Sequence, residues 1–342
     1  MTSEIYTVLT TIHEPDDRIM DWMKITGNKT IVVGDKKTPS HWSHQSCDFI
    51  DLKSQKDSSF EVAKLLPENH YVRKNLGYLF AIKSGAKVII DTDDDNFPFI
   101  AEWKKLLKND FNKIQLRENN DFTFKNIYTH FAETNIPFWP RGFPLNLIKE
   151  SESIISKKNY SSTCVQEVGL WQCMVDGEPD IDAIHRLLYS STPEFLKNDS
   201  LIYSKNNFCS FNSQNTLWSD LEFFPLLYLP STVSFRFTDI LRSYVAQIVI
   251  NAIDKNWGFY PATSYQERNE HDLMCDFDSE TSMYQNMLSI FDILYQSVSS
   301  NLSIIENLIN CYQSLAYKGY VESNEVEILK SWISDISKLL KF

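Results

Sequence analysis

The chain has 342 residues, of which 43% are hydrophobic and 13% aromatic, and its formal net charge is -12 at pH 7. This apolar content excludes a disordered chain, and the acidic balance argues against nucleic acid as a partner, because binding phosphates needs a basic surface. The length fits one large α/β domain, or a domain of common size with an appendage.

The first residues predict a strand rather than a signal peptide, because no basic segment precedes a long apolar core. No stretch approaches the ~20 consecutive apolar residues of a membrane span. The six cysteines lack the paired spacing of zinc sites and of disulfide frameworks. We therefore expect a reduced, cytoplasmic protein.

The first part of the chain predicts alternating strands and helices. Residues 5–12 have the alternation and β-branching of a strand, and residues 14–18 supply a proline and acids suited to the start of a helix. Residues 30–33 predict a second strand, 71–84 a helix, and 88–90 a third strand. This order favours a mostly parallel sheet covered by helices.

The third strand runs directly into four carboxylates: Asp91, Asp93, Asp94 and Asp95. Like charges this close resist full ionisation unless a cation neutralises them, which suggests a site for a divalent metal. An acidic surface turn is the alternative. Ligands of such sheets bind beyond the carboxyl ends of the strands, and the same edge would hold Thr10, Thr11 and Asp35. Because polar residues follow three strand ends at this edge, a ligand site is favoured over an acidic surface turn.

Two loops in the middle of the chain carry charged residues. Residues 138–144 contain two prolines and a glycine, which predicts a loop that displays Arg141. Arginine suits a bidentate grip on phosphate, and pairing with a structural carboxylate is its alternative role. Residues 176–183 offer Asp180 and Asp182. For Asp182 the sequence favours the N-cap of a following helix.

The end of the chain predicts helices at 283–298, 302–317 and 322–340, with apolar residues at helical spacing. No residue there predicts chemistry. These helices could brace the rest of the chain, contact a substrate or form a dimer face, and intramolecular packing is favoured. We therefore expect two units, residues 1–275 and a helical module at 282–342.

Four segments together resemble the STELLO family of glycosyltransferases: 72–96, 139–144, 179–183 and 233–247. The Arg-Gly-aromatic-Pro, Gly-Leu-Trp and Pro-Asp-x-Asp-Ala motifs are also similar to the reversibly glycosylated polypeptides, which include UDP-arabinopyranose mutases. Both families imply a GT-A fold, a Rossmann-like nucleotide-sugar domain whose Asp-x-Asp motif holds manganese or magnesium on a diphosphate. The resemblance covers about residues 5–275 and leaves the C-terminal helices without an interpretation.

The resemblance implies a metal-dependent transferase that moves a sugar from a nucleotide-diphosphate sugar, with UDP favoured, to an acceptor glycan or glycoconjugate. It assigns Asp93 and Asp95 to the metal, Asp94 to sugar or ribose hydroxyls, and Asp91 to support of the loop. A UDP-sugar mutase, favoured by the Arg141 loop, and a non-catalytic assembly protein are the alternatives.

The nucleotide would be bound by residues from the earlier strand ends and from the start of the helix at 71–84. Thr10, Thr11 and Asp35 are expected at the base or ribose, and Arg73 and Asn75 at phosphate. Helix packing is the alternative for Asn75, as it is for Gly77.

The transfer step needs a cation and, for an inverting enzyme, a carboxylate base. Negative charge builds on the leaving nucleotide, and the metal with Arg141 would stabilise it. Asp239 is the first candidate base, with helix capping as its alternative role, and Asp180 is the second. A further polar loop is expected from Tyr260-Pro261 with Gln266, Arg268, Asn269 and His271. This loop could close over the diphosphate, and a solvated loop is the alternative.

The resemblance to the STELLO family also bears on the expected location in the cell. Plant STELLO proteins carry a membrane anchor, whereas this sequence shows none. We therefore expect a cytoplasmic enzyme, with peripheral association at the inner face of the membrane as an option. The donor sugar and the oligomeric state stay open.

Overall fold

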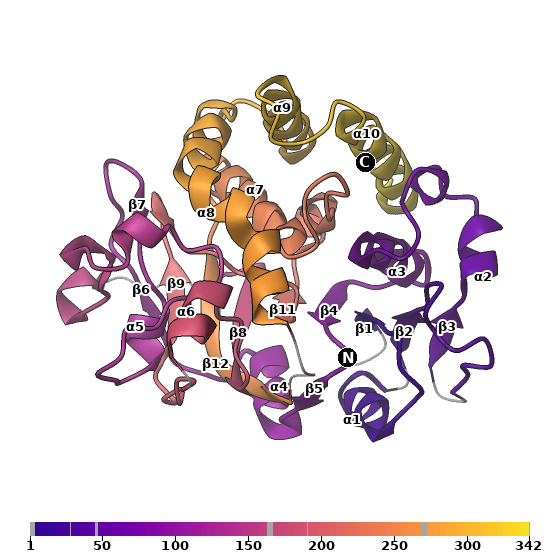
Figure 1. The fold of residues 1–342 in the computed structure, drawn as a ribbon, viewed down its shortest axis with the longest axis horizontal. Helices are drawn as coiled ribbons and strands as arrows, with labels where there is room; N and C mark the ends of the chain where they lie inside the picture. The colour runs from indigo at the N-terminus through magenta and orange to yellow at the C-terminus, as the bar shows by residue number, and fades with distance from the viewer. Residues whose placement is uncertain are drawn as a thin grey trace.

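The computed structural model of the chain describes residues 4–27, 29–44, 47–162, 167–189, 191–267 and 272–341. Within these residues it shows an α/β protein in which ten strands form one sheet. The strand order is β3-β2-β1-β4-β11-β8-β12-β9-β6, and β5 pairs with β12. Helices cover both faces of the sheet, as a GT-A-like fold requires (Figure 1).

The first half of the sheet is parallel. It consists of β1 (Ile5–Thr10), β2 (Thr30–Val33), β3 (Asp48–Ile50) and β4 (Val88–Thr92). Thr10 lies opposite Val33 in the register of β1 and β2, and Val8 lies opposite Asp91 in β4. The three predicted strand ends therefore do meet at one edge of the sheet.

The second half of the sheet is mixed. Its strands are β5 (Asn96–Pro98), β6 (Lys113–Gln115), β8 (Leu170–Gly177), β9 (Ser200–Tyr203), β11 (Asn215–Trp218) and β12 (Trp257–Gln266). Strand β11 is antiparallel to both β4 and β8, and β8 is parallel to β12. The start of β11 and the ends of β8 and β12 consequently lie at the same edge as the ends of β1, β2 and β4. A separate pair consists of β7 (Thr123–Phe124) and β10 (Asn207–Phe208).

Helices of the N-terminal half pack closely on the sheet. Helix α3 (Lys74–Lys83) follows the turn η3 (Tyr71–Arg73) and lies against β1 and β2. A Cβ atom at Gly77 would lie 2.6 Å from Val8 Cγ1, so glycine permits this approach, and the packing alternative given for Gly77 is the one that the structure supports. Helices α1 (Asp17–Thr26) and α4 (Ile100–Lys108) cover the other face.

Between β3 and α8 the helices not yet described are short, apart from α7, which is almost entirely buried. They are α2 (Leu52–Lys56), α5 (Tyr128–Phe131), α6 (Ala183–Leu188), α7 (Thr238–Ala252), and the 3-10 turns η2 (Val62–Lys64), η4 (Leu145–Leu147), η5 (Ser151–Ser153), η6 (Lys157–Asn159) and η7 (Leu221–Leu227). Asp182 is the N-cap of α6, where its carboxylate accepts a hydrogen bond from His185 N at 2.9 Å, so the predicted cap is confirmed.

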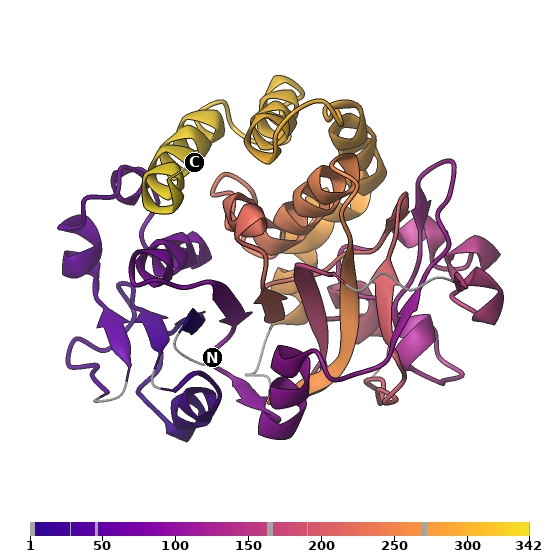
Figure 2. The same ribbon diagram turned by 180° about the vertical axis from the view of Figure 1, so that it is seen from behind.

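Three helices complete the chain: α8 (Leu273–Gln296), α9 (Ile304–Tyr317) and α10 (Glu325–Leu340). They arch over α7 and end near α3 (Figure 2). Their buried apolar side chains belong to the same hydrophobic cluster as those of α3 and α7, which confirms intramolecular packing. Helix α8 begins before the predicted division at 275–282. No helix in the described parts of the chain combines the length and hydropathy needed to span a membrane.

Candidate functional site

A cavity of about 550 Å³ lies at the sheet edge where the strand ends converge. This volume is in the range of sites for small molecules. Its walls come from the ends of β1, β2, β4, β8 and β12 and from the segments before β11 and α7. Among the described residues that were assigned to the nucleotide, the metal or catalysis, all but Asn75 line it: Thr10, Thr11, Asp35, Arg73, Asp93, Asp94, Asp95, Arg141, Asp180 and Asp239.

Asn75 lies elsewhere, and the expectation that it reaches phosphate is wrong. Its side chain is fully buried, its Nδ2 donates to the Leu229 carbonyl at 2.9 Å, and its Oδ1 accepts from Leu229 N at 2.9 Å. The amide thus ties α3 to the chain after η7, because both its donor and its acceptor meet buried backbone groups. Helix packing is the role of this residue.

The four carboxylates at the end of β4 have two roles: Asp91 is buried beneath the cavity lining, whereas Asp93, Asp94 and Asp95 line the cavity. Asp91 is fully buried, with Lys74 Nζ at 2.7 Å from Oδ1 and Arg242 Nη1 at 2.9 Å from Oδ2. Asp93 accepts a hydrogen bond from Tyr71 Oη at 2.8 Å. Burial raises the pKa of Asp93 to about 6 against the opposing effect of the Lys74 ammonium, and the negative charge of Asp95 adds to the rise.

The next two carboxylates are held by neighbouring strands. Thr11 Oγ1 donates to Asp94 Oδ2 at 2.6 Å, and Gln266 Nε2 donates to Asp95 Oδ2 at 2.8 Å. These bonds fix the loop after β4 between β1 and β12. The polar loop expected from Tyr260 to Gln266 is wrong, because these residues belong to β12. Arg268, Asn269 and His271 lie outside the described residues.

Asp93 and Asp95 have the chemistry of a magnesium or manganese site. In the parts of the chain that the structure describes, no three His, Cys, Asp or Glu side chains are grouped so as to hold a metal by themselves. These hard cations, however, commonly use one or two carboxylates together with substrate phosphates and water. A divalent cation would also relieve the repulsion that helps to raise the pKa of Asp93. The two residues therefore fit such an ion.

Arg141, Asp180 and Asp239 form one buried cluster. Arg141 Nη2 lies 2.8 Å from Asp180 Oδ2 and 2.9 Å from Asp239 Oδ2, and Arg141 Nε lies 2.8 Å from Asp180 Oδ1. The side chain of Arg141 is only 7% exposed. Gly142, at φ +87°, lets the loop turn tightly against α7. The ion-pairing alternative thus describes Arg141, and its guanidinium is occupied by carboxylates rather than open for a bidentate phosphate.

Within this cluster Arg141 favours the ionised form of Asp180. Burial alone raises the pKa of Asp180, but the adjoining Arg141 guanidinium more than reverses that effect, so the pKa of Asp180 is lowered. A carboxylate with a lowered pKa is a weaker base. Asp239 is not a helix cap, because the N-cap of α7 is Phe237 and Asp239 lies in the first turn. Its Oδ2 also accepts from Ser213 N at 3.3 Å.

Asp35 and Arg73 organise the opposite wall. The Asp35 carboxylate accepts hydrogen bonds from Asn69 N at 2.8 Å and His70 N at 2.9 Å. Arg73 Nε donates to Gln55 Oε1 at 2.8 Å, whereas its buried Nη2 has no hydrogen-bond partner in the described structure. Asp35 therefore shapes the loop beside it, and Arg73, whose Nη1 also donates to the Leu66 carbonyl at 3.1 Å, is a buried part of the cavity lining.

Sequence reasoning missed the cation at the centre of this network. Lys74 is fully buried, and its Nζ donates to the Thr92 carbonyl at 2.6 Å and to Tyr71 Oη at 2.9 Å. Lysine is seldom fully buried without a partner. The available signal was its place beside Arg73 in an otherwise apolar helix, ahead of an acidic strand end. Ser213 and Arg236, which also line the cavity, carried no comparable signal.

The chain is similar to STELLO glycosyltransferases along nearly its whole length. The sequence model of the family described as STELLO glycosyltransferases matches residues 236–342. Two proteins of Arabidopsis thaliana, Probable glycosyltransferase STELLO1 and Probable glycosyltransferase STELLO2, are each 25% identical over 98% of this chain. The chain spans 44% and 45% of their respective lengths, which is less than half. The STELLO-like resemblance is confirmed, and it includes the C-terminal helices that the motifs did not reach.

Proposed function

We propose that this chain is a glycosyltransferase domain that moves a sugar from a nucleotide-diphosphate sugar, with UDP favoured, to an acceptor glycan or glycoconjugate. The observation that carries this proposal is the cavity at the strand ends, which is lined both by Asp93 and Asp95 and by the Arg141 cluster. Glycosyltransferase similarity over 98% of the chain supports it.

The charge of the cavity supports a requirement for a divalent cation. Among the described residues that line it, seven are Asp or Glu and four are Lys or Arg. A nucleotide diphosphate is itself anionic and would be repelled by this surplus unless a cation accompanied it. In the proposed site Asp93 and Asp95 hold that Mn²⁺ or Mg²⁺, which when bound stabilises charge on the leaving diphosphate.

The other lining residues take complementary roles in the proposal. Thr10, Thr11 and Asp35 lie along the wall formed by β1 and β2, which is assigned to the base and ribose. Asp239 stays the first candidate base for the acceptor hydroxyl and Asp180 the second, since the lowered pKa of Asp180 makes it a weaker base; Arg141 pairs with both carboxylates. Arg141 then acts by holding both carboxylates in place through its ion pairs.

Calorimetric titration with a panel of nucleotide sugars, with and without Mn²⁺, tests this proposal. We expect binding that depends on Mn²⁺, followed by hydrolysis or transfer that releases free nucleotide. Asp93→Asn and Asp95→Asn should each weaken the Mn²⁺-dependent binding at least tenfold, which is about 1.4 kcal/mol. Asp121→Asn is the matched control, because Asp121 is exposed and does not line the cavity.

Three results would contradict the proposal in different ways. Isomerisation of the sugar ring without free nucleotide would identify a mutase. Failure of every nucleotide sugar to bind would favour a non-catalytic assembly protein. Unchanged Mn²⁺-dependent binding in both Asp variants would show that the metal is held elsewhere.

A further inference from the structure

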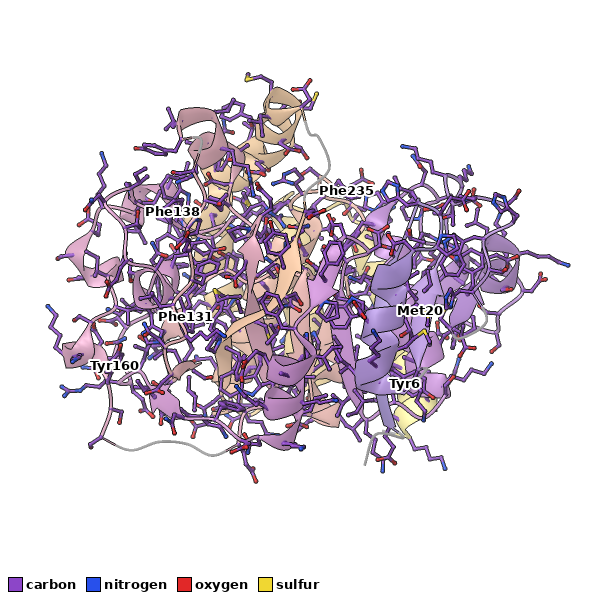
Figure 3. All side chains as sticks on the ribbon, turned by 90° about the horizontal axis from the view of Figure 1, so that it is seen from below. Tyr6, Met20, Phe131, Phe138, Tyr160 and Phe235 are labelled. Atoms are coloured by element: carbon purple, nitrogen blue, oxygen red, sulfur yellow. The ribbon has the colours of Figure 1, made fainter. Side chains whose placement is uncertain are left out.

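Arg236 places a positive charge on the cavity wall next to the Arg141 cluster. Its backbone carbonyl accepts a hydrogen bond from Arg141 Nη1, and its side chain is 13% exposed. The neighbouring Phe235, which is labelled in Figure 3, lines the same cavity. Its side chain is 58% exposed. The segment before α7 thus contributes both a cation and an aromatic ring to the site.

Only one edge of the Arg236 guanidinium is engaged within the described residues. Its Nε pairs with Glu280 on α8 and lies 3.7 Å from Asp276 Oδ1. Its Nη2 is buried and has no hydrogen-bond partner in the described structure. A buried donor without a partner is unfavourable, and a ligand oxygen would relieve this cost. Because Arg236 lines the cavity, its unpaired Nη2 donor is suited to an anion bound beside this residue.

Glu280 is fixed independently of Arg236. It is fully buried, and its Oε2 accepts hydrogen bonds from Ala183 N at 3.0 Å and from Tyr284 Oη. Because α6 and α8 both hold this carboxylate, it acts as a rigid anchor for the Nε edge of Arg236. The orientation of the guanidinium is thereby set by a helix that begins at Leu273.

The C-terminal helices also hold the segment on the N-terminal side of Arg236. Glu325 of α10 is fully buried and accepts hydrogen bonds from Ser231 N at 3.0 Å and Thr232 N at 2.8 Å. Ser234 Oγ donates to a backbone carbonyl of α8 at 2.6 Å. Anchors from both α8 and α10 therefore define how this segment enters the cavity.

We propose that Arg236 binds the anionic diphosphate of the donor through its free edge, and that Glu280 is the positioning residue that presents it. This inference rests on the proposed function. It gives the C-terminal helices a part in the site, since α8 supplies the anchor. Arg141, in contrast, is already occupied by Asp180 and Asp239.

The test compares the binding of UDP and of uridine, both measured by calorimetry with Mn²⁺ present. Arg236→Gln is expected to weaken the binding of UDP at least tenfold and to leave the binding of uridine unchanged, because uridine lacks the diphosphate. Arg236→Lys should recover part of the loss, since it keeps the charge without the planar fork. Arg117→Gln is the control, because Arg117 is exposed and lies outside the cavity.

Glu280→Gln separates positioning from folding. It is expected to weaken the binding of UDP several-fold in the wild-type background. In the Arg236→Gln background it should not weaken UDP binding further, because the two residues act as one unit. Asp292→Asn, at an exposed position of the same helix, is the control. Thermal unfolding of each variant verifies that it is folded. If Glu280→Gln does not fold, the two Arg236 variants still decide the question.

Different results overturn the inference and the proposed function. If the wild-type chain binds UDP and Arg236→Gln binds it equally well, Arg236 does not recognise the diphosphate. The same conclusion follows if Arg236→Gln weakens the binding of uridine as much as the binding of UDP. If the wild-type chain binds no nucleotide diphosphate with any metal, the proposed function itself fails and the inference fails with it.

Discussion

At the scale of single residues, the site is organised by buried ion pairs. Lys74 lies between Asp91 and Asp93, and Arg242 meets Asp91 from the opposite side. Buried charges tolerate this setting only when their partners are present, since the interior solvates ions poorly. The result is that the acidic strand end is held in a fixed shape before any ligand arrives.

Replacing Lys74 by methionine should therefore destabilise the fold. We expect Lys74→Met to lower the free energy of unfolding by about 3 kcal/mol, because Asp91 loses one of its two cations while it stays buried. Urea denaturation measures this change. The control is Lys83→Met at an exposed position of the same helix, which should change stability by about 0.5 kcal/mol or less. Equal stability of the two variants would show that the buried pair contributes nothing net.

At the scale of elements, the cavity depends on how closely α3 approaches the sheet. Gly77 faces Val8 and Val33, and a Cβ at this position would lie 2.6 Å and 2.7 Å from their methyl groups. The same helix carries Lys74 at its start and follows Tyr71 and Arg73 directly. A displaced α3 would consequently move one wall of the site.

Gly77→Ala tests this packing. Overpacking by the added methyl group should lower the free energy of unfolding by about 1–3 kcal/mol. The higher helix propensity of alanine returns at most ~1 kcal/mol, so we expect net destabilisation. Val8→Ala should cost less in the Gly77→Ala background than in the wild type, because it makes room for the new methyl group. Strictly additive losses in urea denaturation would show that the two side chains do not compete for space.

At the scale of the whole molecule, the C-terminal helices share the main hydrophobic core. Trp332 of α10 is fully buried and donates from Nε1 to the Pro225 carbonyl at 3.0 Å. Tyr312 of α9 packs edge-on against Tyr228 at 5.4 Å between ring centroids. Removing these helices would therefore expose apolar surface that belongs to the centre of the protein.

We expect the full chain to unfold in a single calorimetric transition, because its helical module and its sheet have no separate cores. A chain ending at residue 302, which lacks α9 and α10, should lose its cooperative transition. Tyr317→Ala, at a position that is 87% exposed, is the control and should unfold like the wild type. Two separate transitions, or a truncated chain with the wild-type midpoint, would show that the unit at 282–342 folds independently.

The sequence by itself determined the features that depend on neighbouring residues. The apolar strands, the acidic run after β4 and the loop around Arg141 are local patterns, and the rule for strand ends places most of the predicted residues around one cavity. The N-cap role of Asp182 followed from its position before a helix. Motif content likewise identified the STELLO-like resemblance.

Only the tertiary structure decided which partners these residues meet. Whether Asn75 faces a ligand or a backbone amide, and whether Arg141 is open or held by Asp180 and Asp239, depends on segments far apart in the chain. The link from Glu280 to Arg236 joins α8 to the segment before α7. Hydrogen bonds and ion pairs act over a few ångströms in space, whereas sequence patterns report only distance along the chain.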